Sequence, residues 1–203
     1  GAALMAALLF GFGGYSYIYP IVAFFITSTI LSFFKKQNTK IIKSDRTIKQ
    51  VYANGGIALF ICILNYFFSH SLIYPCFLAS VTAANSDTWG TEFGKKSNKK
   101  PIDILSGNAV IEGASGGITL YGTIGSIIGA ILIGIIGYFF LTDIKIISLI
   151  IISGFISSIF DSILGSSVQA RYISADGLII TEKYEESYYL YTGSNKVNND
   201  IVN

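Results

Sequence analysis

The chain has 203 residues, of which 52% are hydrophobic and only 13% are charged, and its mean hydropathy is +0.59. A soluble domain carries about 25% charged residues, so this composition excludes an ordinary soluble protein. The uncharged runs are continuously apolar rather than alternating, which predicts an all-α, polytopic integral membrane protein rather than a barrel. Because a spanning helix needs roughly 20 mostly apolar residues, we expect about five to six transmembrane helices.

The first half of the chain predicts three helical regions. Residues 1–34 contain no charge and predict one long helix or two short ones, with a break around Gly13, Gly14 and Pro20. A basic loop follows, and a second helix is expected over about residues 51–69. The stretch "SHSLIYP" turns the chain into a third helix over about residues 72–94, which a second basic loop follows.

The second half begins with a glycine-rich stretch, "GASGGITLYG", which we expect to open a fourth helix that runs to about residue 141. The short turn "LTDIK" leads to a fifth helix over about residues 145–170. Residues 171–203 are polar and tyrosine-rich, and we expect them to lie outside the membrane. We treat residues 1–203 as a single membrane domain. Because the chain opens on Gly1 and stops at Asn203, we expect it to be truncated at one or both ends.

The basic loops at residues 35–49 and 95–100 predict the orientation of the helices. Loops rich in Lys and Arg stay in the cytoplasm, and these two are separated by two helices, as alternation requires. The turns near residues 70 and 143 then lie outside, and the tail from residue 171 lies inside. Setting this topology is also the simplest role for most of the lysines. The same topology gathers polar residues from separate stretches at the cytoplasmic face: Arg46, Lys49, Asn54, Asn85, Asp87, Glu92, Asp161, Gln169, Asn199 and Asp200.

Asp161 is the clearest candidate for function, because a charge at membrane depth is costly. At helical spacing its face carries the small residues Gly154, Ser157, Ser158 and Gly165, so that another backbone or a ligand can approach closely. This pattern favours ligand or metal binding. The alternative is a helix-packing face on which the aspartate is hydrogen-bonded to a neighbour.

The third helix carries a second polar cluster. Asn85, Thr88 and Glu92 share one face of this helix, whereas Asp87 and Thr91 share another. Asp87 has small neighbours, so we expect it to pack against a partner helix, which we interpret as the fifth. Two carboxylates brought together repel each other unless a cation lies between them, and carboxylate oxygens suit Mg²⁺. The alternative is an ion pair of Asp87 with Lys or Arg and no metal.

The glycine-rich stretch suggests a cradle for an anion. Glycines let backbone N–H groups approach a phosphate, and the start of a helix favours negative charge. Ser115, Gly116 and Gly117 face the compartment of the carboxylates, whereas Gly125 and Gly129 form a GxxxG pair that we interpret as helix packing. Together these features predict chemistry on phosphate with a metal, and the membrane predicts that one partner is a lipid. No pattern for nucleic acid is present, and nothing sets an oligomeric state.

Five ordered stretches resemble the motifs of one family. "KQVYANGG", "ANSDTWGTEFGKKS", "GASGGITLYGTIGS", "DSILGSSVQARY" and "NNDIVN" are similar to those of domain of unknown function 92, also called the transmembrane-protein-19-like family. The resemblance covers about residues 25–203. The family is polytopic and α-helical, and it includes the phytyl-phosphate kinases of plants and cyanobacteria. One departure is that some members carry Cys-x-x-Cys-Gly where this chain has "ISADG", so no metal-thiolate role is possible there.

The resemblance implies roles for the matching residues. It implies Mg²⁺ as cofactor and a phosphoryl donor, CTP or ATP, whose group passes to an isoprenyl monophosphate to give the diphosphate. Asp87 and Asp161 are then the expected metal ligands, with Glu92 and Asp200 as second choices. The residues expected to contact substrate or nucleotide, or to neutralise phosphate charge, are Asn54, Arg46, Lys49, Asn85, Thr88, Thr91, Ser115, Gly116, Gly117, Gln169, Arg171 and Asn199.

Two other functions stay open at this point. A nucleotidyltransferase that makes a CDP-activated lipid would use the same metal site and release pyrophosphate. A transporter would be marked by glycine-broken helices with polar residues at the membrane midplane. The polar groups of this chain are instead expected at one face, which argues against transport.

Overall fold

A computed structural model describes residues 2–33, 48–112, 114–175, 180–181, 186–197 and 199–202 of the chain. The helices are α1 (Ala2–Gly13), α2 (Tyr15–Phe33), α3 (Ile48–Phe67), α4 (Ile73–Gly94), α5 (Leu120–Tyr138), α6 (Ile144–Ser167) and the short α7 (Asn199–Val202). The strands are β1 (Ile102–Asp103), β2 (Gly117–Ile118), β3 (Arg171–Ser174), β4 (Ile180–Thr181) and β5 (Tyr188–Thr192).

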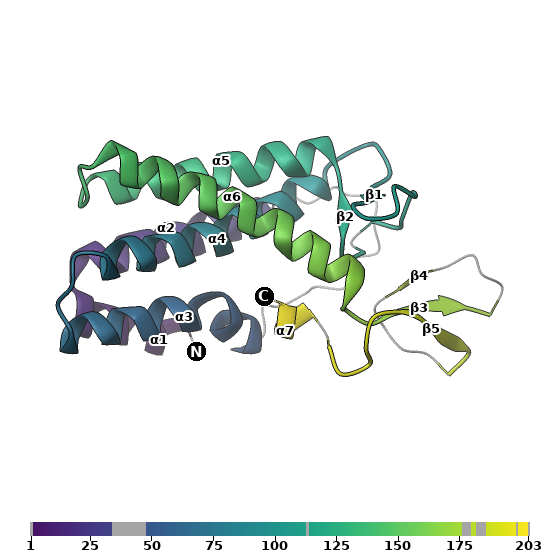
Figure 1. Cartoon of the computed structure of the whole chain (residues 1–203), viewed down its shortest axis with the longest axis horizontal. Helices are drawn as coiled ribbons and strands as arrows, with labels where there is room; N and C mark the ends of the chain where they lie inside the picture. Colours follow the sequence, from purple (N-terminus) through teal and green to yellow (C-terminus); the bar gives the residue numbers. More distant parts are fainter. Residues whose placement is uncertain are drawn as a thin grey trace.

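Helix α4 lies at the centre of the bundle and contacts α2, α3, α5 and α6. Figure 1 shows α5 and α6 on one side of it and α1 and α3 on the other. The short turns that join α3 to α4 and α5 to α6 lie at one end of the bundle, and strands β1 to β5 lie at the other, which we call the sheet end (Figure 1). Alternate helices therefore run in opposite directions, as the sequence predicts.

The lengths of the helices and their outward faces confirm the predicted class. By length and composition, three of the described helices can cross a bilayer, α2, α5 and α6, and α1 and α3 contain shorter apolar stretches. Large apolar side chains lie exposed on the outer faces of these helices, where lipid replaces water as the solvent. Examples are Phe10, Ile26, Phe60, Ile131, Leu149 and Ile152. The molecule is a mostly helical, polytopic membrane protein.

The break predicted in the first region falls at a single glycine. Gly14 has a φ of +69°, a backbone conformation that favours glycine, and it separates α1 from α2. Pro20 lies inside α2 and does not end it. The buried faces of α1 and α2 are apolar and include Met5, Leu9 and Phe24, which are fully or almost fully buried.

The GxxxG pair of α5 packs against α4, as predicted. A Cβ added to Gly125 would lie 2.6 Å from the Cβ of Phe93, and one added to Gly129 would lie 2.9 Å from the Cβ of Trp89. Only glycine therefore allows the two helices to approach this closely. The approach stabilises the bundle through van der Waals contacts.

Two features differ from the all-α prediction. Strands β1 and β2 form an antiparallel pair, and β4, β3 and β5 form a three-stranded antiparallel sheet in the tail that we predicted only to be polar. In addition, α5 begins at Leu120 and not at residue 113. The hydroxyl of Thr119 accepts a hydrogen bond from the Gly122 N–H and caps this helix, so the glycine-rich stretch precedes it as loop and strand.

Candidate functional site

A pocket of about 410 Å³ lies between α3, α4 and α6 and reaches α7. Three of the predicted site residues line it, one from each long helix: Asn54, Asp87 and Asp161. Asn54 lies six residues after the start of α3, Asp87 seven residues before the end of α4, and Asp161 six residues before the end of α6. At 1.5 Å per residue, all three lie about 9–11 Å inside the sheet end.

The side chains of Asp87 and Asp161 come together across the pocket, within reach of a hydrogen bond between their carboxyl groups. Small residues allow this approach, because a Cβ added to Gly154 of α6 would lie 3.1 Å from the carbonyl carbon of Thr82 in α4. The expected packing of Asp87 against the fifth predicted helix, α6, is therefore confirmed. Two carboxylates this close stay ionised together only if a cation lies between them; otherwise they share a proton.

The donor set fits Mg²⁺. This ion is commonly held by one or two carboxylates, while water and substrate phosphates fill its other positions. Among the described side chains, no three of His, Cys, Asp or Glu gather in one place, and Asp87 and Asp161 are the described carboxylates that line this pocket. The third expected ligand, Asp200, belongs to α7, which contacts α3 and α6 at this pocket, but its side chain lies outside the description. Metal binding by these residues stays a prediction.

Asn85 faces α5 and not the pocket. Its amide nitrogen donates a hydrogen bond of 2.7 Å to the carbonyl of Gly129, and the residue is fully buried. Ser86 likewise donates to the carbonyl of Ser126 at 2.9 Å. These bonds join α4 to α5, so Asn85 contributes to helix packing, and its expected contact with substrate stays a prediction.

Three other predicted residues of α4 lie outside the pocket lining. Glu92 forms an ion pair with Lys95 one turn along the helix, at 2.9 Å. Thr91 is exposed and Thr88 is half-buried, and neither lines the pocket. Glu92 therefore has a cation beside it already, and its expected part in metal binding remains untested.

The glycine-rich stretch packs against the last turn of α6. Gly116 has a φ of +78°, and a Cβ added to it would lie 2.6 Å from the Cβ of Ser166. The Cβ of Ser115 lies against Gly165, which is one helical turn beyond Asp161 on the same face of α6. Ser115 and Gly116 thus lie against the turn of α6 that follows Asp161, whereas Gly117 packs on Pro101 and Val110. None of the three predicted cradle residues lines the pocket or forms the start of a helix.

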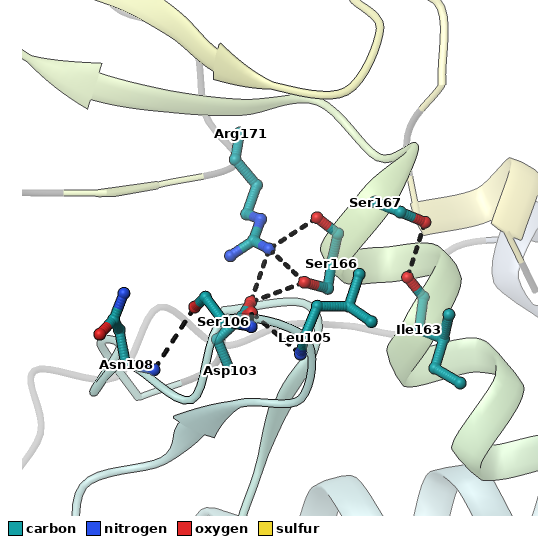
Figure 2. Close-up of polar contacts among 8 residues, drawn as sticks. All are labelled: Asp103, Leu105, Ser106, Asn108, Ile163, Ser166, Ser167 and Arg171. Atoms are coloured by element: carbon teal, nitrogen blue, oxygen red, sulfur yellow. Dashed lines mark hydrogen bonds and ion pairs between the residues drawn. The ribbon is translucent and has the colours of Figure 1, made fainter.

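Asp103 forms a buried polar cluster that the sequence analysis missed, and Figure 2 shows its contacts. One oxygen, Oδ2, accepts hydrogen bonds from the Arg171 guanidinium at 2.7 Å and from the Ser166 hydroxyl at 2.8 Å. The other, Oδ1, accepts from the backbone N–H groups of Leu105 and Ser106. The Arg171 guanidinium also donates to the Ser166 carbonyl at 2.8 Å. This cluster ties the β1–β2 pair to the end of α6 and the start of β3.

The electrostatics of this cluster favour the charged pair. The side chains of Asp103 and Arg171 are only 3% and 4% exposed. Burial alone raises the pKa of the Asp103 carboxyl, but the hydrogen bonds from Ser106 and Ser166 and the positive charge of Arg171 together outweigh it, and the pKa falls below its usual value of 3.8. The carboxylate is therefore ionised at neutral pH.

Arg171 and Gln169 occupy structural positions near this cluster. The charge of Arg171 is balanced by Asp103, and the residue does not line the pocket, so its predicted role in neutralising substrate phosphate remains a prediction. Gln169 is 2% exposed, and its side-chain oxygen has no hydrogen-bond partner in the described structure. In the sequence, the position of Arg171 close after an apolar helix could have indicated a carboxylate partner, because a buried arginine needs one, and the structure shows that this partner is Asp103.

Four predicted residues cannot be placed by their side chains. Arg46 lies outside the described residues. Lys49, Asn199 and Asp200 belong to described helices, α3 and α7, but their side chains lie outside the description. Their expected contacts with phosphate or metal stay predictions.

Fold and site together define a polytopic helical membrane protein with a pair of contacting carboxylates in a pocket between its helices. The family described as integral membrane protein DUF92 matches residues 1–203, and the chain belongs to this family. It is 35% identical over 175 residues to an uncharacterized membrane protein of Methanocaldococcus jannaschii, a match that covers 84% of this chain and 73% of that protein. No solved structure matches the chain. The family resemblance is therefore confirmed.

Proposed function

We propose that the protein transfers the terminal phosphoryl group of a nucleoside triphosphate, CTP or ATP, to an isoprenyl monophosphate. The product is the isoprenyl diphosphate, and the reaction takes place at the cytoplasmic face of the membrane. The observation that carries this proposal is the contact between Asp87 and Asp161 at one end of a pocket inside an apolar helix bundle. A pair of ionisable groups in such a place is costly and indicates a function.

The orientation in this proposal rests on the basic loop after α4. This loop joins the end of α4 to β1 at the sheet end, carries Lys95, Lys96, Lys99 and Lys100, and is of the kind that stays in the cytoplasm. A soluble nucleotide and a membrane-bound lipid would then meet where Asp87 and Asp161 lie. The position of the pair, about 9–11 Å inside the sheet end, favours an interfacial reaction over transport through the midplane.

Each group at the site would have one task. Asp87 and Asp161 would hold Mg²⁺, which neutralises the charge of phosphate oxygens when it is bound. Asn54, which lines the pocket from α3, would contact the same phosphates through its side-chain amide. Ser115 and Gly116, beside Gly165, would bind a second phosphate from the loop.

The reaction needs no strong general base to activate the attacking oxygen. An oxygen of the lipid phosphate forms a bond to the terminal phosphorus of the triphosphate, and the bond from that phosphorus to its bridging oxygen breaks. The nucleoside diphosphate leaves with the electron pair. The attacking oxygen is already ionised, so positioning and charge neutralisation suffice.

The test is transfer of labelled terminal phosphate in proteoliposomes that hold the purified chain, Mg²⁺ and geranylgeranyl monophosphate. We expect the Asp87→Asn and Asp161→Asn variants to lose activity by about 100-fold or more, because loss of even an indirect metal contact costs 10–100-fold. Glu186→Gln is the matched control, since it removes an exposed carboxylate outside the pocket. No labelled diphosphate with either CTP or ATP would refute the proposal, and release of pyrophosphate would indicate a nucleotidyltransferase.

A further inference from the structure

The pocket continues well past the carboxylate pair, toward the middle of the bundle. It is lined there by Ala79 of α4 and Ser153 of α6, each eight residues before the aspartate of its helix. At 1.5 Å per residue this places the deep end about 12 Å beyond Asp87 and Asp161. The polar end of the pocket therefore lies near the sheet end, and a long second half extends into the membrane.

This deep half is mostly apolar, although Ser80 and Ser153 line it and Ser157 lines the pocket between Ser153 and Asp161. The hydroxyl of Ser80 donates to the carbonyl of Phe77 at 2.8 Å, and the hydroxyl of Ser153 donates to the carbonyl of Ile150 at 2.9 Å. Both hydroxyls are thus satisfied within their own helices and require no polar ligand. The neighbouring lining residues are alanines, and their small side chains leave the space open.

The walls of the pocket are placed so that it opens sideways. Both α3 and α6 pack on α4, which forms the floor. At the rim, Ile57 of α3 is 61% exposed and Phe160 of α6 is 59% exposed. In a bilayer these rim side chains contact lipid, so the opening between α3 and α6 leads into the hydrocarbon region and not into water.

We infer that the deep half of this pocket binds the hydrocarbon chain of a single-chain lipid phosphate, which enters sideways from the bilayer between α3 and α6. The phosphate head lies at Asp87 and Asp161, and for the head this inference rests on the proposed function. A pocket of about 410 Å³ is near the lower limit for ligand sites, so it fits one chain and not the two chains of a bilayer phospholipid. Ser153 and Ala79, at its far end, then set how much of the chain is bound.

The test is ligand binding, measured as the rise in melting temperature of the purified chain in detergent with Mg²⁺ and no nucleotide. The probes are dimethylallyl, geranyl and geranylgeranyl monophosphate. For the unchanged protein the affinity should increase with chain length. Ser153→Phe fills the deep end, so it should weaken binding of the geranylgeranyl probe about tenfold or more and leave the dimethylallyl probe unchanged, since each buried methylene adds to affinity.

Ile152→Phe is the matched control, because Ile152 is the preceding residue of α6, is 53% exposed and lies outside the pocket. Ala79→Leu fills the deep end from α4, the floor of the pocket, and should repeat the loss if Ser153→Phe does not fold. Affinity independent of chain length, as expected if a protein segment fills the pocket, would overturn the inference. So would an equal loss in Ile152→Phe. Length-dependent binding without phosphoryl transfer would support the lipid pocket and refute only the proposed kinase activity.

Discussion

The buried pair of Asp103 and Arg171 allows a quantitative prediction about stability. Each side chain is at most 4% exposed, and their atoms Oδ2 and Nη2 lie 2.7 Å apart. Asp103→Asn leaves the guanidinium buried without a counter-charge, and Arg171→Met does the same to the carboxylate. Removal of one partner from such a pair costs about 3–5 kcal/mol.

This cost converts into a melting temperature. For a chain of 150–250 residues, each kcal/mol lowers the melting temperature by about 2–4 °C, so each single variant should melt roughly 6–20 °C lower. The double variant should lose less than the sum of the two, by about 1–3 kcal/mol, because no unpaired charge remains. Thermal unfolding of all four proteins in one detergent, followed by circular dichroism, measures both quantities.

The reasoning has a clear point of failure. The Ser166 hydroxyl donates to the same carboxylate oxygen and accepts from the Arg171 guanidinium, so Ser166→Ala should cost about 1.5–3 kcal/mol, as expected for hydrogen bonds to charged groups. Single variants of Asp103 or Arg171 that melt within 2 °C of the unchanged protein would show that this pair is solvated and not buried. Strictly additive losses would show that the two residues do not interact.

Two further predictions concern acid and helix packing. The pKa of Asp103 is lower in the folded state than in the unfolded state, where it is about 3.9. The carboxylate therefore contributes its full stabilisation above the unfolded-state pKa and loses it as the pH falls through the folded-state pKa. The difference in melting temperature between the unchanged protein and Asp103→Asn should be constant from pH 7 to 5 and shrink below pH 4. Gly125→Ala places a Cβ 2.6 Å from the Cβ of Phe93 and should destabilise the bundle by about 1–3 kcal/mol. Gly56→Ala is the control and should not destabilise it, because no atom lies within 4 Å of the added Cβ. Equal melting temperatures for these two variants would refute the close α4–α5 contact.

The helices could be predicted because membrane helices are defined by local composition. Uncharged runs of sufficient length located α2, α3, α4 and α6 within a few residues of their observed bounds. The start of α5 could not be found in this way, since glycines are common both in membrane helices and in loops. The decisive residue there is Thr119, whose hydroxyl caps the helix and separates it from the glycine-rich stretch.

The three-stranded sheet had a signal that composition alone concealed. Tyr188–Thr192 reads "YYLYT", which is rich in residues that favour strands, but it lies in a polar tail. Its partner, Arg171–Ser174, directly follows the apolar helix α6, and the two strands pair antiparallel. Such a pairing depends on a contact between distant segments, so no local pattern establishes it.

The two aspartate clusters differ in how far the sequence can reveal them. Asp87 and Asp161 interrupt apolar runs, have small neighbours and lie at similar distances from the ends of their helices, and each of these features can be read from the local sequence. Because alternate helices run in opposite directions, the two aspartates then lie at the same end of the bundle, where they contact each other. Asp103 closely follows the basic stretch that ends at Lys100, where the sequence predicts a solvated carboxylate, and it is 68 residues from Arg171. Because burying an unpaired charge is costly, a buried Arg171 requires a carboxylate partner. The sequence does not show that this partner is Asp103, because their contact forms only when the β1–β2 pair packs against the end of α6.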